Sequence, residues 1–212
     1  MTKKIIPAIL ATTIEEFNEK LNHLLSFSNE IQIDVMDGAF VKESSFDLFE
    51  LNSLPEDKKF ECHLMVAHPL EYINHMKRLG IKKVVFHDEI DEDTETAIEG
   101  YKKEGFEVFL AINPETEPGV IEKYISIVGG IMLMSVEPGK SGQEFIHSSL
   151  VKARYLREKY PDLILEMDGG INKENIKDVF ESGVNIVAIG SGILKAQNPE
   201  EEWEELVRIS KL

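Results

Sequence analysis

The sequence has little cysteine and no long apolar run, and each absence excludes a class of protein. Among its 212 residues there is one cysteine, Cys62, so no disulfide can form within the chain. No apolar stretch approaches the roughly 20 residues of a membrane-spanning helix. No Pro/Gly/Ser-rich linker or low-complexity run divides the chain. We therefore expect a soluble, cytoplasmic protein that folds as a single domain over residues 1–212.

Positive charge is also scarce. The chain has 23 Lys and Arg against 39 Asp and Glu, which gives a formal net charge of -16. An acidic surface repels nucleic acid and anionic membranes, so we expect neither as a partner. It also repels a phosphorylated metabolite at long range. Any phosphate site is therefore expected to act locally, through backbone N–H groups and helix N-termini.

Short apolar runs alternate with longer amphipathic segments. The predicted strands are Ile5–Leu10, Ile31–Met36, Phe60–Val66, Lys83–His87, Glu107–Ile112, Gly130–Ser135, Leu163–Met167 and Ile186–Gly190. The predicted helices are Ile14–Leu25, Leu70–Leu79, Thr94–Lys103, Phe145–Tyr160, Asn172–Ser182 and Pro199–Ile209. Eight strands in such an alternation predict an α/β protein of the (β/α)8 TIM barrel class. A doubly wound open sheet is the alternative, but it usually has fewer strands, and no GxGxxG motif follows the first run.

Barrel enzymes carry their active residues at the carboxyl ends of the strands, so polar groups there are the candidates. In the second strand, Gln32, Asp34 and Met36 share one face because strand side chains alternate. In the third strand, His63 and Met65 share a face, while Cys62 points the other way. Cys62 is more simply a buried structural thiol than a nucleophile, because nothing in the sequence suggests a lowered pKa.

Glycine-rich turns follow three of the later strands. Asp168 ends the seventh and precedes Gly169 and Gly170, where turn formation alone is the simpler reading. The other two turns are Pro138–Gly142 and Gly190–Gly192. Glycine lets backbone N–H groups approach an anion closely, so the three turns together indicate a phosphate site.

Two aspartates and a histidine near one end of a barrel suggest proton transfer beside a divalent metal. Asp34, His63 and Asp168 are the candidate ligands, and carboxylate with imidazole suits Zn²⁺, Mn²⁺, Fe²⁺ or Co²⁺. The residues by themselves thus predict a sugar-phosphate site with acid–base chemistry.

Motifs along nearly the whole chain resemble the ribulose-phosphate 3-epimerase family. The matching stretches, in family order, are Pro7–Leu10, Ile33–Gly38 with Phe40-Val41, His63–Val66, Phe86-His87, Asn113–Thr116, Met134–Gln143, Asp168–Asn172 and Gly190-Ser191. The resemblance implies interconversion of ribulose 5-phosphate and xylulose 5-phosphate by inversion at C3. It matches Asp34 to the base that removes the C3 proton and Asp168 to the acid on the opposite face.

The resemblance also implies how the intermediate and substrate are held. Asp34, His63 and Asp168 match metal ligands that stabilise a cis-enediolate. The remaining matches are to substrate-binding positions: Met36, Met65 and Met134, which would crowd the intermediate and exclude water, together with His63, Gly139, Lys140, Ser141, Gly142, Gly169, Gly170, Gly190 and Ser191. The family often forms oligomers, so a homo-oligomer is one expectation.

The chain departs from the family pattern at a few positions. Gln32 replaces a histidine that ligates the metal, and an amide oxygen is a poorer zinc ligand, so Gln32 is at most a weak one. His87 could compensate in part or simply line the pocket, and the second reading is favoured. Ala8 replaces a substrate-contacting serine. Lys140 could contact phosphate or offset Glu137.

Three functions remain open at this point. A metal-assisted pentulose-phosphate 3-epimerase leads, because Asp34, His63 and Asp168 are all present. Epimerisation of another ketose phosphate, such as a hexulose 6-phosphate, is the second. A catalytically weakened sugar-phosphate-binding protein is last, because a binding module needs no opposed proton carriers. Decarboxylases resembling orotidine-phosphate decarboxylase carry Asp-x-Lys-x-x-Asp, and the lysine is missing from the stretch beginning at Asp34.

Overall fold

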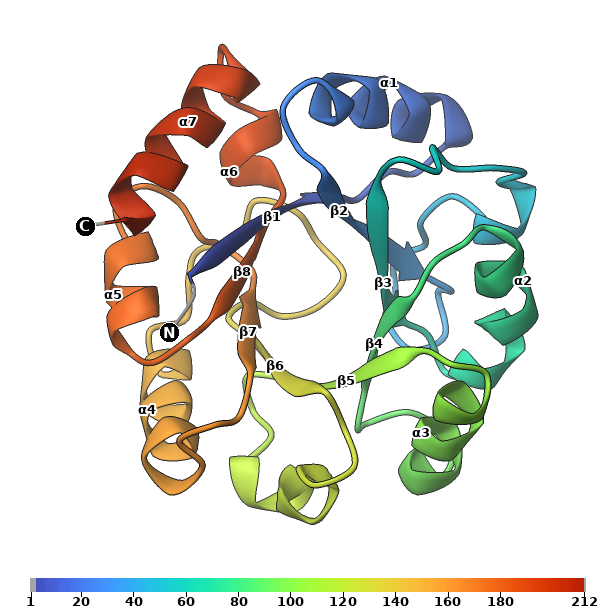
Figure 1. The fold of residues 1–212 in the computed structure, drawn as a ribbon, viewed down its shortest axis with the longest axis vertical. Coiled ribbons are helices and arrows are strands. Elements are labelled where there is room, and N and C mark those ends of the chain that lie inside the picture. The colour runs from blue at the N-terminus through green and yellow to red at the C-terminus, as the bar shows by residue number, and fades with distance from the viewer. Residues whose placement is uncertain (1–2, 212) are drawn as a thin grey trace.

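The computed structural model describes residues 3–211, so both ends of the predicted domain 1–212 lie outside the described residues. Eight parallel strands close into a barrel in chain order, and the last strand pairs with the first. Figure 1 shows the strands in the centre of the molecule and the helices in a ring around them. The architecture is the predicted (β/α)8 TIM barrel.

The elements alternate along the chain. The strands are β1 (Lys4–Ile9), β2 (Glu30–Met36), β3 (Lys59–Met65), β4 (Lys83–His87), β5 (Glu107–Ile112), β6 (Gly130–Met134), β7 (Leu165–Asp168) and β8 (Ile186–Ile189). The α-helices are α1 (Ile14–Leu25), α2 (Ile73–Arg78), α3 (Thr94–Lys103), α4 (Ser149–Lys159), α5 (Ile176–Glu181), α6 (Ser191–Leu194) and α7 (Pro199–Ser210). Three 3-10 helices complete the ring: η1 (Leu48–Glu50), η2 (Pro69–Tyr72) and η3 (Pro118–Tyr124).

Local capping fixes where the regular helices begin and end. The Thr13 side chain accepts a hydrogen bond from the Glu16 N–H at the start of α1, and Asp93 does the same for Thr96 at the start of α3. Gly80 and Gly105, with φ of 77° and 84°, follow α2 and α3 in the left-handed conformation that ends a helix. The predicted bounds of α1 and α3 are accordingly correct.

Three predicted helices are wrong in part. The predicted helix Leu70–Leu79 is split into η2, which begins at Pro69, and α2, which begins at Ile73. The predicted helix Phe145–Tyr160 begins at Ser149, since the Ile146 N–H instead donates to the Ser135 carbonyl at 2.8 Å.

The predicted helix Asn172–Ser182 begins at Ile176. Its first residues form a turn held by side chains: Asn172 Oδ1 accepts from the Glu174 N–H at 2.8 Å, and Asn175 Oδ1 accepts from the Asn172 N–H at 2.9 Å. Asparagine side chains offer the backbone these alternatives to a helix. Of the remaining predicted elements, Lys83–His87 and Glu107–Ile112 have the observed bounds, and the others differ from the observed ones by one or two residues.

The apolar core has two layers, set by the alternation along each strand. Ile33, Val35 and Cys62 point outward into a large cluster between the barrel and its helices. Val85 and Phe109 belong to a smaller cluster inside the barrel. Burial raises the pKa of the Cys62 thiol, in keeping with a structural thiol.

The amino-terminal end of the barrel interior holds a charged cluster. Lys83 Nζ donates to Glu166 Oε2 at 2.6 Å, lies 2.7 Å from Glu61 Oε2, and sits 3.8 Å from the centre of the Phe109 ring. All three charged side chains are nearly inaccessible to solvent. Burial, together with the nearby Glu166 carboxylate, raises the pKa of Glu61 to about 8 despite the Lys83 ammonium. One lysine thus compensates a pair of buried carboxyl groups.

No helix within residues 3–211 combines the length and the apolar character needed to cross a membrane.

Candidate active site

The adjacent strands β2 and β3, together with β7, bring the candidate catalytic side chains together at the carboxyl end of the barrel. Asp34 lies in β2 directly opposite His63 of β3, and Asp168 ends β7. On β3 the alternation aims Glu61, His63 and Met65 into the barrel, so the histidine stands above the charged cluster and toward the carboxyl end. The sheet therefore places the predicted aspartate pair and histidine over the barrel mouth.

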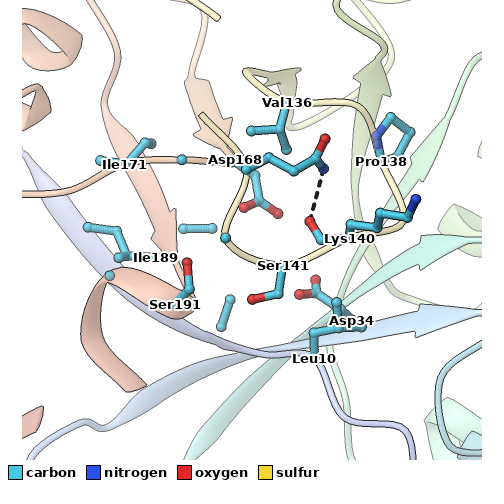
Figure 2. Close-up of a pocket in the computed structure, with 18 of the residues that line it drawn as sticks. Leu10, Asp34, Val136, Pro138, Lys140, Ser141, Asp168, Ile171, Ile189 and Ser191 are labelled. Atoms are coloured by element: carbon cyan, nitrogen blue, oxygen red, sulfur yellow. Dashed lines mark hydrogen bonds between the residues drawn. The ribbon is translucent and has the colours of Figure 1, made fainter. Parts of the chain in front are cut away.

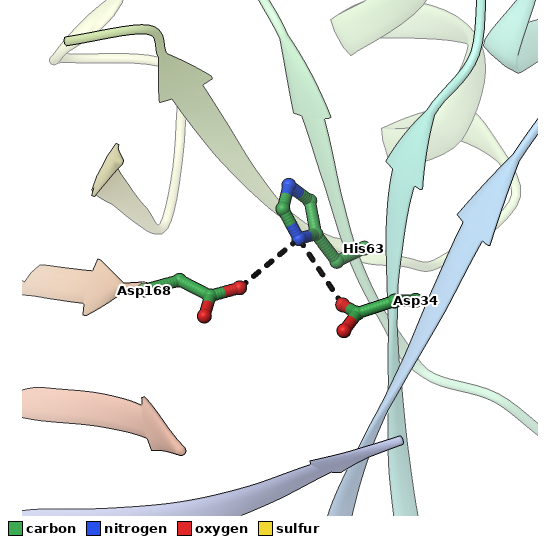
Figure 3. Close-up of side chains that lie close together, drawn as sticks. All are labelled: Asp34, His63 and Asp168. Atoms are coloured by element: carbon green, nitrogen blue, oxygen red, sulfur yellow. Dashed lines mark hydrogen bonds and ion pairs between the residues drawn. The ribbon is translucent and has the colours of Figure 1, made fainter. Parts of the chain in front are cut away.

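Asp34, His63 and Asp168 form one compact group. His63 Nδ1 lies 3.3 Å from Asp34 Oδ1 and 3.3 Å from Asp168 Oδ2, and Figure 3 shows the two carboxylates approaching this one ring nitrogen from either side. His63 is fully buried, whereas each aspartate keeps a small exposed fraction, 8% for Asp34 and 9% for Asp168. Two carboxylates thus flank one space from opposite sides.

The electrostatics of this group favour a positive charge at its centre. Burial raises the pKa of Asp34, and the nearby Asp168 carboxylate raises it further, while the hydrogen bond with His63 opposes both. Burial lowers the pKa of His63, but its contacts with Asp168 and Asp34 outweigh burial and raise that pKa to about 10. The two carboxylates therefore stabilise positive charge at the point they share, whether it is carried by His63 or by a bound cation.

The spacing of the three side chains fits a divalent metal. Their ligand atoms all lie within 4.8 Å of one another. An ion with bonds of about 2.0–2.2 Å in tetrahedral geometry separates its ligand atoms by about 3.3–3.6 Å. The two distances of 3.3 Å from His63 Nδ1 match that separation. The donor set of two carboxylates and an imidazole also suits the borderline divalent ions.

Gln32 contacts the same two carboxylates. Its Nε2 donates to Asp34 Oδ1 and to Asp168 Oδ2, each at 2.8 Å, and the side chain is fully buried. Its Oε1, the amide atom able to bind a metal, finds no hydrogen-bond partner within the described part of the chain. In this orientation Gln32 ties the aspartates together. A half-turn of the amide would bring Oε1 to the position of Nε2.

The pocket above this group has a volume of about 330 Å³. Asp34 and Asp168 enter it from two sides, as Figure 2 shows. Of the predicted site residues, those lining it are Asp34, His63, Met65, Met134, Gly139, Lys140, Ser141, Gly142, Asp168, Gly169, Gly170, Gly190 and Ser191. Met36 is buried but is not among the lining residues, so its contact with substrate stays a prediction.

Two glycines let the segment after β6 fold down against the end of β7. A Cβ on Gly169, at φ 114°, would come within 2.4 Å of the Val136 side chain, and one on Gly170, at φ 64°, would meet the Phe145 backbone at 2.9 Å. The turn reading of this glycine pair is therefore supported, since both conformation and space require glycine. The close approach also brings residues 137–143 over the pocket.

Two lysines at the pocket were missed by the sequence analysis. Lys20 Nζ, from α1, donates to the Leu10 carbonyl at 2.6 Å and pairs with Glu16. Lys195 follows α6, and its Nζ lies 2.9 Å from where a Cβ on Gly142 would stand. The two lysines add positively charged side chains to a pocket for which the sequence analysis expected backbone N–H groups and helix N-termini. No sequence motif marks these lysines, because only the closed barrel brings α1 and the segment after β8 to the pocket.

Lys140 and His87 also differ from the simplest sequence reading. Lys140 Nζ pairs with Glu43 at 3.1 Å rather than with Glu137, and so links the loop after β6 to the loop after β2. His87 lies behind His63 and away from the pocket, with the two Nε2 atoms 2.9 Å apart.

Polar side chains gathered at the carboxyl ends of the barrel strands, with glycine turns around them, are the arrangement of TIM-barrel enzymes. The family model described as the ribulose-phosphate 3 epimerase family matches residues 4–194. The chain therefore belongs to the ribulose-phosphate 3-epimerase family, whose members are isomerases.

Individual relatives agree with the family match. The chain is 32% identical to a ribulose-phosphate 3-epimerase of Schizosaccharomyces pombe, with 93% of this chain and 90% of the relative covered. It is 34% identical to one from Buchnera aphidicola subsp. Baizongia pistaciae, with 90% and 88% covered. Among solved structures, 3-hexulose-6-phosphate synthase from Salmonella typhimurium superposes with a TM-score of 0.73 at 14% identity, covering 98% of each chain. That likeness concerns the fold alone.

Proposed function

We propose that the protein interconverts ribulose 5-phosphate and xylulose 5-phosphate by moving the proton at C3 from one face of the sugar to the other. The placement of Asp34 and Asp168 on opposite sides of one pocket carries this proposal. Inversion at carbon needs a proton acceptor on one face and a proton donor on the other. Asp34 would take the proton from ribulose 5-phosphate, and Asp168 would deliver one to the opposite face.

The surroundings of Asp34 suit a general base. The pKa of Asp34 is raised, first by burial, and so lies closer to neutral pH. A carboxylate with such a pKa both accepts and releases a proton readily. Met65 and Met134 form part of the pocket wall beside it. Their apolar side chains would exclude water from the proton-transfer step and so prevent loss of the proton to solvent.

Asp34, His63 and Asp168 would together hold a divalent cation, Zn²⁺, Mn²⁺, Fe²⁺ or Co²⁺. The matched 3.3 Å separations and the charge balance of the group support this assignment. When bound, such a cation supplies positive charge against the enediolate that develops as the C3 proton leaves. The protein's own part is to orient the two carboxylates and to keep His63 Nδ1 facing the ion.

The glycine turns and the two lysines would bind the phosphate end of the substrate. Gly142, Gly170 and Gly190 expose backbone to the pocket, and Lys20 and Lys195 supply local positive charge in an otherwise acidic protein. Backbone N–H groups position a phosphate, and a lysine adds a charge-assisted contact.

Replacing Lys195 by glutamine should raise the KM for ribulose 5-phosphate about 5- to 30-fold and leave kcat nearly unchanged, because a charge-assisted contact contributes about 1 to 2 kcal/mol. Initial rates over a range of substrate concentrations measure the effect. Lys177→Gln removes the same charge from α5, outside the pocket, and serves as control. Equal KM values for the two variants would remove Lys195 from the phosphate site.

Replacing Gln32 by histidine should tighten metal binding at least about tenfold, because an imidazole would replace the amide that now donates to both carboxylates. Calorimetric titration of chelator-treated protein with Zn²⁺ measures the dissociation constant. Ala8→Ser reverses another departure from the family pattern without adding a strong metal ligand, and should leave the dissociation constant unchanged. An unaltered constant in the Gln32 variant would mean that this side chain does not reach the ion.

The experiment that tests the proposed function is an epimerase assay on ribulose 5-phosphate. Chelator-treated protein is assayed alone and after addition of Zn²⁺, Mn²⁺, Fe²⁺ or Co²⁺. We expect turnover that returns with at least one of these ions. Folded protein without turnover under any of these conditions would contradict the proposal.

A six-carbon ketose phosphate is the second candidate substrate. Ala8 lines the pocket at the position where the family usually has a serine, so the side chain there is smaller and less polar. The same assay with a hexulose 6-phosphate separates the two candidates through the ratio of their kcat/KM values.

A further inference from the structure

A second histidine and a carboxylate continue the active-site group on the side away from the pocket. Figure 3 shows one ring nitrogen of His63 between the two carboxylates and the other directed away from them. That other nitrogen, Nε2, lies 2.9 Å from His87 Nε2. His87 Nδ1 in turn lies 3.5 Å from Glu89 Oε2. Both histidines have no exposed surface.

The short contact between the two Nε2 atoms constrains the hydrogens on both rings. At 2.9 Å one nitrogen must carry the hydrogen and the other must accept it, since two lone pairs or two N–H groups would repel each other. In a neutral imidazole the hydrogen sits on one nitrogen only. The nitrogen that carries the hydrogen in a neutral His63 therefore determines which nitrogen carries it in His87.

A metal on His63 Nδ1 would fix the direction of the whole chain of contacts. His63 then carries its hydrogen on Nε2 and donates to His87 Nε2. His87 must carry its own hydrogen on Nδ1, which faces Glu89 Oε2. If His87 instead carried its hydrogen on Nε2, the lone pair of its Nδ1 would face the carboxylate oxygen of Glu89. Two buried acceptors would then repel each other.

Glu89 is fixed at its other oxygen. Its Oε1 accepts from the Asn113 N–H at 2.9 Å and from the Thr116 hydroxyl. Its Oε2 and His87 Nδ1 are both buried, and within residues 3–211 neither makes a hydrogen bond, so each has the other as a polar neighbour at 3.5 Å. The carboxylate is thus held in place with one oxygen reserved for His87.

We propose that Glu89, acting through His87, sets the tautomer of His63 that binds the metal, so that both are positioning residues for the ion. The inference rests on the proposed metal site of Asp34, His63 and Asp168. It adds a requirement for two side chains that touch neither the ion nor the substrate.

Replacing Glu89 by glutamine tests this inference sharply, because it reverses one contact without removing the side chain. The backbone N–H of Asn113 can only donate, so the amide oxygen must take the place of Oε1. The amide NH₂ group then faces His87 Nδ1 as a donor. His87 is driven to the tautomer with its hydrogen on Nε2, which opposes the metal-binding form of His63.

Calorimetric titration with Zn²⁺ should give a dissociation constant about 10- to 100-fold higher for Glu89→Gln than for the unaltered protein. Asp91→Asn is the matched control, because Asp91 is an exposed acid lining the same side cavity as Glu89. It removes the same charge and should leave the constant unchanged. Equal constants for Glu89→Gln and the unaltered protein would overturn the inference, as would equal weakening in both variants.

Nitrogen-15 NMR of the histidine rings gives a readout that a merely structural role would not change. In the Zn²⁺-loaded protein we expect the hydrogen of His63 on Nε2 and that of His87 on Nδ1. A His87 hydrogen on Nε2 would overturn the inference even if the protein binds Zn²⁺ and is an active epimerase. An unaltered protein that binds none of Zn²⁺, Mn²⁺, Fe²⁺ and Co²⁺ would overturn the metal assignment and this inference together, while the epimerase assay judges the proposed function separately.

Discussion

Replacing Asp34 by asparagine should lower kcat for ribulose 5-phosphate about 1,000-fold or more, while the protein still folds. The asparagine keeps the shape of the side chain but cannot accept the C3 proton, and general base catalysis is worth about 10²- to 10⁴-fold. Losing one carboxylate also weakens the proposed metal site. Steady-state rates measure the loss, and a near-normal rate would contradict the assignment of Asp34 as the base.

Asp168→Asn is the matched variant, since it removes the opposing carboxylate from the same group. Both variants should fail to epimerise, so exchange of the C3 hydrogen of ribulose 5-phosphate with deuterated water distinguishes them. Asp168→Asn keeps the base for this substrate and should still exchange, whereas Asp34→Asn should not. Exchange in Asp34→Asn and none in Asp168→Asn would reverse the two roles.

Replacing Lys83 by methionine should lower the free energy of unfolding by about 3–5 kcal/mol, because it leaves Glu61 and Glu166 buried without a counter-charge. Denaturant titration measures the change through the unfolding midpoint and slope. Lys82→Met, at the exposed neighbouring position, is the control and should change stability little. A loss below about 1 kcal/mol for Lys83→Met would show that the cluster is not needed for stability.

The loss of unfolding free energy in Lys83→Met should depend on pH. The pKa of Glu61 is already raised to about 8, above its value of about 4.3 in an unfolded chain. A carboxyl group with a raised pKa contributes stability that is present at low pH and lost as pH rises through the folded value. Without the Lys83 ammonium the pKa of Glu61 should rise further. The deficit of the variant should therefore be smaller at pH 5 than at pH 8.

Much of the fold was predictable because strand and helix signals are local. The apolar runs Lys83–His87 and Glu107–Ile112 became β4 and β5 with the predicted bounds. The errors arose where a side chain or a distant strand competed for the backbone. The Ile146 N–H donates to Ser135 rather than starting a helix, and Asn172 holds a turn ahead of α5.

The candidate site was predictable in its members but not in its supporting contacts. Asp34, His63 and Asp168 stand at strand ends within family-like motifs, so the sequence identifies them. The contacts behind His63, and the lysines Lys20 and Lys195 at the pocket, join segments far apart in the chain. No local pattern records those distances.

The sequence by itself determined the alternation of strands and helices, the family, and which two aspartates lie near the barrel mouth, because these depend on residue order and on motifs along the chain. Only the tertiary structure decided that Gln32 ties the aspartates together, that Lys195 reaches Gly142, and that His87 backs His63. Barrel closure fixes these contacts, because it sets the distances between side chains from different strands.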